Sequence, residues 1–523
     1  MIAAQRIRRR EPQAAGSSFP AHLHPVSRRI LLARGVTDAD ALRLGLRDMY
    51  PPDGLSGLNS AARLLADSVS QDRSVLVVGD FDADGATGTS LAVAALRAMG
   101  CARVDFRVPN RFEFGYGLTA PLVETLAGDP PDLLVTVDSG IACNEGVGRA
   151  RELGCQVIVT DHHLPGSVLP DANAIVNPNC PDDRFPSKAL AGVGVMFYLL
   201  GAVRGVLRER GWFSRARPEP NLASFLDLVA LGTVADLVPL DRNNRILVRQ
   251  GLERIRRGLA RPGLMALLRL GNRDYRYASA ADLGFAVAPR LNAAGRLEDM
   301  SAGIECLITG SVPQAEAIAD ELNTLNNQRK QIEQGMLTQA LEDMQTLLAT
   351  LEAEQLHAGL CLYNSDWHQG VIGLLAARIK EHFHRPVIAF ADASDDAGSS
   401  EIKGSARSIR GLHIRDVLDA IAANELTIQR EEQALASLRE EQQAELAALS
   451  RSQAQRQAGG AVAEGHHKGG AMAKAEGAAA HTDGPVVLAV SHGVHGVEAE
   501  GPASLQRKIC RADHQRGRWL PAC

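Results

Sequence analysis

The sequence predicts an α/β protein, in which a parallel-sheet domain is joined by a long helix to a second, smaller α/β domain. Between residues 74 and 178, short apolar runs alternate with helical patterns, which is typical of a parallel sheet. From 314 to 355 the chain has no proline and a single glycine and is rich in Glu, Gln, Leu and Ala, which indicates a helix. A second α/β pattern runs from about 360 to 423.

Five apolar runs are the predicted strands of the first domain: "SVLVVGD", "RVDFRVPN", "PDLLVTVDSG", "CQVIVTDHH" and "ANAIVNPN". The helical patterns "TSLAVAALRAMG" and "NEGVGRARELG" lie between some of them, and a mostly helical region covers 189–240. Pro313 stands where the long helix can start. We therefore predict an N-terminal segment (1–70), a sheet domain with a helical part (71–311), a connecting helix (312–355), a second domain (356–423) and an atypical, disordered tail (424–523).

Composition excludes several classes of protein. The 523 residues carry a net charge of -5, so any binding to nucleic acid must come from a local basic groove. The eight cysteines form no CxxC pair and no zinc-like Cys/His spacing, which favours free thiols in a reducing compartment. The longest apolar run, 189–203, is shorter than the roughly 20 residues that span a bilayer. The basic N-terminal "RIRRREPQ" is not followed by the apolar segment of a secretory signal. We expect a cytoplasmic protein with no membrane partner.

Acids and histidines gather where the predicted strands end. Because the carboxyl ends of parallel strands share one edge of a sheet, we expect these residues to meet in one crevice. Several carboxylates and an imidazole suit hard or borderline divalent cations such as Mn²⁺ or Mg²⁺, and two such ions can hydrolyse a phosphoester. The residues are Asp80, Asp82 and Asp84 after the first run, Asp138 after the third, Asp161, His162 and His163 after the fourth, and Asp236 after a helical stretch.

Structural roles compete with this interpretation at single positions. "DFDADG" fits the start of an EF-hand loop, but that loop needs a glutamate where Leu91 stands and should follow a helix. Asp84, ahead of "GATGTS", can equally be a helix N-cap, and one histidine alone is more often structural than a ligand. The glycines of "AGVGV", 191–195, are more typical of close helix packing than of phosphate binding.

Four motifs together resemble the DHH phosphoesterase superfamily: "VVGDFDADGATGT", "VTVDSG", "TDHH" and "LGTVADLVPL", in that order. The resemblance is closest to the RecJ family of bacterial exonucleases, through "RVPNRFEFGYGL", "LAGVGVMFYLL", "APRLNAAGRLEDM" and "SDWHQGVIGLLAARIKE". "KGSARSI" resembles the phosphate-gripping motif of the DHH-associated second domain. The similarity covers about 28–423. It implies an exonuclease that degrades single-stranded DNA from the 5′ end in DNA repair and recombination.

The resemblance also implies roles for the acids around two ions, Mn²⁺ or Mg²⁺. Asp82 and Asp138 would serve one ion, with Asp80 nearby. The other ion would be served by Asp84, Asp138, His162 and Asp236, with Asp138 bridging. Asp161 would orient the neighbouring histidines. His163 would face the scissile phosphate, to stabilise its charge or protonate the leaving oxygen.

Several residues outside the acid cluster are predicted to contact DNA. The resemblance places Arg111, Ser405 and Arg407 around the 5′-terminal phosphate, and Arg290, Asn292 and Arg296 along the approach to the metals. Phe112, Phe114 and Tyr116 can stack on bases. Capping or ion pairing on the surface is the alternative for the approach residues, and core packing for the aromatic ones. Single-stranded DNA is the expected partner, and the resemblance also implies a single-strand-binding protein and a helicase.

The chain departs from the RecJ pattern after about 424. "GGAMAKAEG" only weakly resembles a glycine-rich family motif, and no strand-rich pattern follows it. We therefore expect an incomplete second domain and a weaker affinity for DNA. Two other functions stay open: a phosphodiesterase of the same superfamily acting on short oligonucleotides or cyclic dinucleotides, and a non-catalytic DNA-binding protein.

Overall fold

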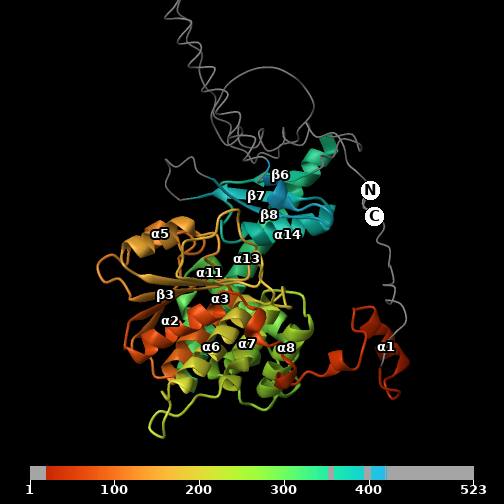
Figure 1. The fold of residues 1–523 in the computed structure, drawn as a ribbon. Helices are drawn as coiled ribbons and strands as arrows, with labels where there is room; N and C mark the ends of the chain where they lie inside the picture. Colours follow the sequence, from red (N-terminus) through yellow and green to blue (C-terminus); the bar gives the residue numbers. More distant parts are fainter. Residues whose placement is uncertain (1–18, 351–358, 394–401, 419, 421–523) are drawn as a thin grey trace, which may run out of the picture. The chain divides into compact units, whose positions relative to one another are not determined.

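The computed structural model describes residues 19–350, 359–393, 402–418 and 420 (Figure 1). The predicted tail, 424–523, lies outside these residues. The chain divides into two compact units, 1–332 and 333–523, and the division falls within the long helix α13, Val312–Thr350. The predicted α/β class is confirmed, and the helix begins one residue before Pro313. The boundaries of the five predicted segments stay a prediction.

A five-stranded parallel sheet forms the centre of the first unit, in the order β2-β1-β3-β4-β5. All five strands fall in the predicted runs: β1 Val75–Gly79, β2 Val104–Arg107, β3 Leu133–Val137, β4 Gln156–Thr160 and β5 Ala174–Val176. In the central pairing Val75 faces both Val104 of β2 and Leu133 of β3. The strand order reverses between β1 and β3. Open α/β sheets bind ligands in the crevice beyond such a switch point.

Helices cover both faces of this sheet, as its apolar strands require (Figure 1). On one face Val77 and Val135 pack in a large core with α2 Leu58–Ser70, α3 Ala83–Ala98, α6 Gly192–Glu209 and α7 Leu226–Ala235. On the other face Val78 and Leu134 pack against α4 Ala120–Glu124 and α5 Asn144–Glu152. Apart from short 3-10 helices, the other helices before α13 are α1 Pro25–Leu32, α8 Arg242–Arg256, α9 Pro262–Leu270, α10 Ala280–Asp282, the π-helix η6 Leu283–Val287, α11 Ala288–Leu297 and α12 Ser301–Ile308.

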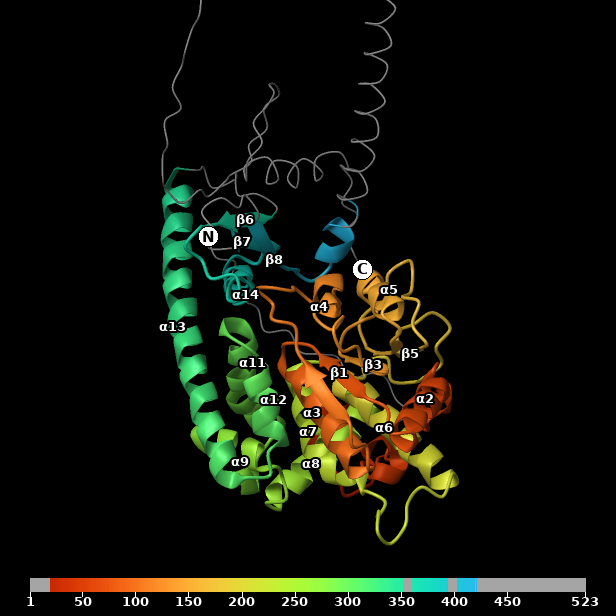
Figure 2. The same ribbon diagram turned by 90° about the vertical axis from the view of Figure 1, so that its left-hand side faces the viewer.

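Helix α3 lies close against the sheet, and glycines at two of its positions allow this approach. A Cβ atom at Gly85 would lie 2.7 Å from the backbone of Asp80, and one at Gly88 would lie 2.5 Å from the Val137 side chain. The helix therefore begins six residues earlier than the predicted pattern at Thr89, directly after the acidic loop. α12 packs along α3 in turn (Figure 2). This close approach fixes the end of α3 against the carboxyl ends of β1 and β3.

The second unit contains a three-stranded sheet, β6 Leu360–Tyr363, β7 Val387–Asp392 and β8 Ile402–Arg407. β6 and β7 are parallel, as an α/β pattern predicts, and β8 adds an antiparallel edge strand. Helix α14, Ile372–Phe383, connects β6 to β7 and packs on the sheet. No helix in the described part of the chain is long and apolar enough to cross a membrane.

Candidate metal centre

The loop after β1 carries three aspartates into the start of α3. Asp80 directly follows the strand, and Asp82 is the N-cap of the helix, where its Oδ1 accepts hydrogen bonds from Asp84 N (2.8 Å) and Gly85 N (3.1 Å). The N-cap role considered for Asp84 is therefore wrong, because the helix begins earlier and Asp84 lies in its first turn. The strand before the loop also excludes the EF-hand.

Asp84 is held by the first backbone amides of a second helix. Gly192 N donates to its Oδ2 at 2.6 Å and Val193 N to its Oδ1 at 3.0 Å, at the N-terminus of α6. A Cβ atom at Gly192 would lie 2.7 Å from Asp138 Oδ1, so only glycine lets this helix reach the acids. The "AGVGV" glycines allow close packing, as predicted. Sequence reasoning missed that the same amides hold an acidic side chain, although a helix N-terminus favours one.

Asp138 follows β3 in the left-handed region, with φ 61°, and is only 1% exposed. Its backbone amide donates to Thr160 O at 3.1 Å, and its backbone carbonyl accepts from the Tyr116 hydroxyl at 3.0 Å. Aspartate and asparagine adopt this conformation more readily than most residues. These backbone contacts leave the Asp138 carboxylate as the group that faces the other acids.

His162 brings an imidazole to the same carboxylates. Its Nε2 lies 3.0 Å from Asp138 Oδ1 and 3.4 Å from Asp236 Oδ2, which comes from the end of α7. Burial and the charge of His163 lower the pKa of His162 to about 4, so the ring is neutral at ordinary pH. The contact with Asp138 is therefore not an ion pair. The hydrogen bond of the ring to the backbone of Leu190 is made by its other nitrogen, since Nε2 has no hydrogen-bond partner among the described residues. With the proton on that nitrogen, the lone pair of Nε2 faces the carboxylate oxygen.

Asp161 holds the second histidine and the loop around it. Its Oδ1 lies 2.8 Å from His163 Nδ1 and also accepts from the amides of His162 and His163, while its Oδ2 accepts from Ile141 N at 2.9 Å. Burial by itself lowers the pKa of His163, but the hydrogen bond and charge of Asp161, with Asp236 and Asp80, raise it to about 9. The half-exposed ring of His163 is thus fixed through one nitrogen only.

The described protein groups do not offset the negative charge that the ionised carboxylates of the cluster would carry. Burial raises the pKa of Asp80, Asp84 and Asp138 well above the usual range, and neighbouring acids raise it further. Burial, with the charge of Asp82, also raises the pKa of Asp236 to about 7. Four buried atoms of the cluster have no hydrogen-bond partner among the described residues: Asp80 Oδ1, Asp138 Oδ1, Asp236 Oδ2 and His162 Nε2. Such atoms are costly unless a cation binds them.

The donor atoms fit divalent metal ions. Potential ligand atoms lie within 4.8 Å of one another in two groups, Asp80 with Asp82 and Asp138, and Asp84 with His162 and Asp236. A third such group joins Asp138, His162 and His163, but its His163 Nδ1 already bonds to Asp161. Ligands at right angles around an ion bound at about 2.1 Å lie about 3.0 Å apart. His162 Nε2 and Asp138 Oδ1 have this spacing, so Asp138 can join the two groups.

Aromatic and basic side chains border the acids. Phe81, between two of the aspartates, carries the Arg111 guanidinium 3.9 Å above its ring and contacts Tyr116 edge to face at 5.7 Å. Tyr116 contacts His163 in the same way at 6.1 Å and is 47% exposed. Arg111 Nε is buried without a hydrogen-bond partner among the described residues. Phe114 is half-buried and packs against the core beneath α4 and α5, in line with its alternative role, and sequence reasoning missed Phe81.

The approach residues predicted on α11 make contacts within the protein. Asn292 Oδ1 accepts from Ala83 N at 2.7 Å and so fixes the start of α3. All three guanidinium nitrogens of Arg290 donate to protein oxygens, on Asn323, Ala286 and Leu270. These contacts favour a supporting role for Arg290. Arg296 is half-buried near the C-terminal end of α11.

Ser405 and Arg407 lie side by side on β8 in the second unit. Arg407 Nη1 donates to Ser405 Oγ at 3.3 Å and to Ala406 O at 2.8 Å. A Cβ atom at Gly373 would lie 2.8 Å from Arg407 Nη2 and 2.9 Å from Ser405 Oγ, so both groups lie against the first turn of α14. A hydroxyl, a guanidinium and a helix N-terminus are the groups that bind phosphate oxygens.

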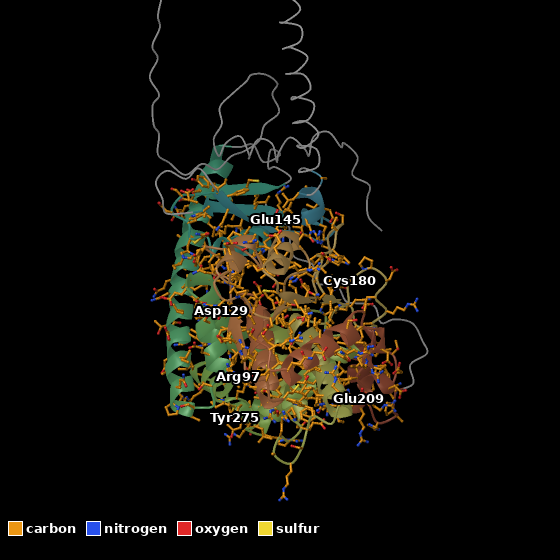
Figure 3. The ribbon with its side chains drawn as sticks, turned by 60° about the vertical axis from the view of Figure 1, so that its left-hand side comes forward. Arg97, Asp129, Glu145, Cys180, Glu209 and Tyr275 are labelled. Carbon is orange, nitrogen blue, oxygen red and sulfur yellow. The ribbon has the colours of Figure 1, made fainter. Side chains whose placement is uncertain are left out.

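The acids lie at one end of the first unit. Glu145, in the first turn of α5, marks the carboxyl-end side of the sheet in Figure 3, and Arg97, near the C-terminal end of α3, marks the opposite side. The acidic loop is at the N-terminal end of α3, at the switch point between β1 and β3. The structure therefore confirms that acids and histidines from distant segments meet at one edge of the sheet.

The fold and the site define a DHH-type protein with an appended second domain. Residues 74–233 match the model of the DHH family, N-terminal domain, and residues 353–427 match that of the DHHA1 domain. The chain is 53% identical to the single-stranded-DNA-specific exonuclease RecJ of Salmonella typhimurium over 80% of its own length and 71% of that protein's. The same protein of Escherichia coli is 53% identical over 79% of this chain and 71% of its own length. The chain therefore belongs to the RecJ exonuclease family.

Solved structures agree with this membership. The crystal structure of an exonuclease RecJ bound to manganese matches with a TM-score of 0.57 and 35% identity, over 70% of this chain and 85% of that one. RecJ of Thermus thermophilus in complex with Mn²⁺ matches with a TM-score of 0.59 and 33% identity, over 74% of this chain and 52% of that one.

Proposed function

We propose that this protein is a metal-dependent exonuclease that degrades single-stranded DNA from the 5′ end, in DNA repair and recombination. Relatives with about half of their residues identical are named single-stranded-DNA-specific exonucleases. Solved structures of a RecJ relative are complexes with Mn²⁺ or Mg²⁺. The observation that carries the proposal is the unneutralised cluster at the β1/β3 switch point, where His162 Nε2 and Asp138 Oδ1 face each other at 3.0 Å.

The proposed cofactors are two ions, Mn²⁺ or Mg²⁺. Asp80, Asp82 and Asp138 would hold one ion, and Asp84, His162 and Asp236 the other, with Asp138 shared. When bound, such a pair of ions activates an attacking water and stabilises charge on the phosphodiester. The α6 amides hold the Asp84 carboxylate by two hydrogen bonds and orient it toward the second group. The α3 amides hold the Asp82 carboxylate in the same way.

His163 and Arg111 would act on the phosphate itself. Asp161 accepts from His163 Nδ1, so the proton on Nε2 can be donated to a phosphate oxygen or to the leaving oxygen. Arg111 is held over Phe81, and its guanidinium can donate to a phosphate oxygen beside Asp80 and Asp82. Tyr116 offers an exposed ring to a base while its hydroxyl supports Asp138.

The proposed activity is tested with a single strand labelled at one end. We expect the full chain with Mn²⁺ to release mononucleotides from a 5′-phosphorylated strand of 30 nucleotides, to leave the duplex form intact, and to do nothing in EDTA. Products from the 3′ end would reject the polarity. Cleavage of dinucleotides with no cleavage of the long strand would favour the short-oligonucleotide phosphodiesterase, and binding without any turnover would favour a non-catalytic protein.

Asp161→Asn is expected to lower kcat about 10- to 100-fold, because an amide at this position no longer fixes the tautomer and orientation of His163. The affinity for Mn²⁺ should stay within about twofold, since Asp161 is outside both ligand groups. Steady-state kinetics and calorimetric titration with Mn²⁺ measure the two effects. Loss of Mn²⁺ binding with a normal kcat at saturating metal would instead make Asp161 a support of the ligands.

Arg407→Lys is expected to remove the preference for a 5′-phosphate. We propose that Arg407 and Ser405 bind a phosphate at the first turn of α14, and lysine cannot reproduce the paired donors of a guanidinium. The measurement compares kcat/KM on 5′-phosphorylated and 5′-hydroxyl strands. The variant should lose about tenfold on the first and little on the second. Equal losses on both strands would show that Arg407 contributes to general binding or folding only.

Partners and location extend the proposal. We infer a cytoplasmic enzyme, which is supported by the free thiols of Cys101, Cys143, Cys155, Cys180 and Cys306. By family membership we further propose that a single-strand-binding protein and a helicase supply the strand. Co-purification of the full chain with each of them from cell extract tests this.

A further inference from the structure

Leu237, directly after Asp236, combines two unfavourable properties. Its backbone is in the left-handed region, with φ 59°, and its side chain is 83% exposed. A branched, bulky residue seldom adopts this backbone, because its Cβ crowds the neighbouring carbonyl oxygen. An exposed leucine also contributes little burial to compensate. The fold of the free protein therefore gives no reason for leucine at this position.

Other helices of the same chain show what this position normally holds. Leu237 follows the C-cap residue of α7, and its amide donates to Val234 O at 3.3 Å. The equivalent left-handed residue after α3, α5, α6 and α8 is glycine in each case: Gly100, Gly154, Gly211 and Gly258. Among the described residues, the other positive-φ residues that are not glycine are Asp, Asn or His, which tolerate this backbone. Leu237 is the exception.

The place of Leu237 connects it to the metal centre. Asp236 Oδ2 lies 3.4 Å from His162 Nε2, so the next residue stands at the edge of the acid cluster. Val234 packs against Gly284 of η6, where a Cβ atom would lie 3.3 Å from it, and the following Phe285 is 81% exposed. Leu237 and Phe285 are thus two large exposed apolar side chains at elements that pack together, the C-terminal end of α7 and η6.

We propose that Leu237 contacts a nucleobase of the strand whose phosphodiester lies at the metal centre. This inference rests on the proposed function. A nucleoside is attached to every phosphate that enters the site, and the face of its base is the large apolar surface of a nucleotide. Leucine offers no hydrogen bond, so it accepts every base equally. This suits an enzyme that must remove nucleotides of any sequence.

Two substitutions separate the side chain from the backbone. Leu237→Asn removes the apolar contact and keeps a residue that tolerates the left-handed region, whereas Leu237→Met keeps an apolar side chain. We expect kcat/KM on a single strand to fall about tenfold for Leu237→Asn and by less than about twofold for Leu237→Met. We expect the Tm of Leu237→Asn to be unchanged or up to about 2 °C higher, because strain is relieved.

Leu259→Asn is the matched control. Leu259 is a second exposed leucine, 54% exposed, next to Gly258, which packs on Tyr275. Tyr275 lies at the Arg97 end of the unit, away from the acidic loop (Figure 3). This variant should cleave single strands as the wild type does.

A strand with one abasic site tests the base contact itself. The site is placed in turn at each of the first three nucleotides from the 5′ end. At one position the abasic site should lower kcat/KM of the wild type about tenfold. The same abasic site should cause no further loss in Leu237→Asn, because the substitution has already removed the contact. Independent, multiplicative losses at all three positions would overturn the proposal. So would a Tm of Leu237→Asn several degrees below the wild type, since the leucine would then pack within the protein.

Failure of the proposed function gives a different result. If the wild type does not cleave single strands with Mn²⁺, the exonuclease proposal fails. The contact of Leu237 is then read from binding alone, by the fluorescence anisotropy of a labelled strand with Ca²⁺ in place of Mn²⁺. A weaker affinity for the normal strand in Leu237→Asn, with equal affinities of the two proteins for the abasic strand, supports the contact. Equal affinities for both strands overturn it.

Discussion

Asp138→Asn is expected to abolish cleavage of single-stranded DNA without unfolding the protein. Asp138 Oδ1 lies 3.0 Å from His162 Nε2, and its carboxylate also belongs to the group of Asp80 and Asp82. Its contacts with both groups place this acid, among the described residues, where it can serve both proposed ions. Metal ions contribute several kcal/mol of charge stabilisation to such a reaction, and losing about 4 kcal/mol corresponds to about 10³-fold in rate.

The fold should survive this substitution because its local contacts are made by the backbone. Thr160 O accepts from the Asp138 amide, and the Tyr116 hydroxyl donates to the Asp138 carbonyl. Asparagine also tolerates the observed φ of 61°. The Tm and the circular dichroism spectrum should therefore stay close to those of the wild type. Alanine at this position would add backbone strain, so a loss of cleavage could not be separated from a loss of stability.

Asp72→Asn is the matched control for this experiment. Asp72 has a similar backbone, with φ 52°, and is exposed before β1, at the end of the sheet opposite to the acids. Both substitutions replace a carboxyl group by an amide at a residue with a left-handed backbone. An end-labelled strand with Mn²⁺ is the assay. Cleavage by Asp138→Asn within about tenfold of the rate of Asp72→Asn would contradict the proposed centre, given that a lost metal ligand costs far more.

The sequence predicts the sheet and the set of acids well, for physical reasons that can be named. Strands buried on both faces are continuous apolar runs, so β1 and β3 stand out in the chain. Parallel strands must place their carboxyl ends together, so Asp80 and Asp138 meet although 58 positions separate them. Local pattern and topology are sufficient for this part of the site.

Contacts between distant segments are where prediction from sequence fails. The N-cap is Asp82 and not Asp84, because the glycines of α3 let the helix start earlier against the sheet. The amides of α6 that hold Asp84 lie more than 100 positions away in the chain. The three guanidinium nitrogens of Arg290 likewise donate to oxygens of distant residues, and its contact with DNA stays a prediction. No local pattern encodes these partners.

Mn²⁺ is expected to raise the Tm of the wild type by several degrees, and Asp138→Asn should lose most of this increase. A ligand at about 100 times its Kd stabilises the folded state by about 2.7 kcal/mol per site. In EDTA the difference in Tm between Asp138→Asn and the wild type should disappear or change sign. Burial and the neighbouring acids raise the pKa of Asp138, which means that its ionised form destabilises the metal-free fold. The metal-free variant should therefore be as stable as the metal-free wild type, or more stable.

This reversal separates a metal centre from an acidic cluster with a purely structural role. If the carboxylate of Asp138 stabilised the fold through protein contacts, Asp138→Asn would lower the Tm equally with Mn²⁺ and with EDTA. Its Oδ1 has no hydrogen-bond partner among the described residues, which argues against such contacts. Asp72→Asn should follow the wild type under both conditions. Differential scanning fluorimetry of the three proteins, with and without Mn²⁺, measures all six values. A wild-type Tm that does not respond to Mn²⁺ would contradict the centre.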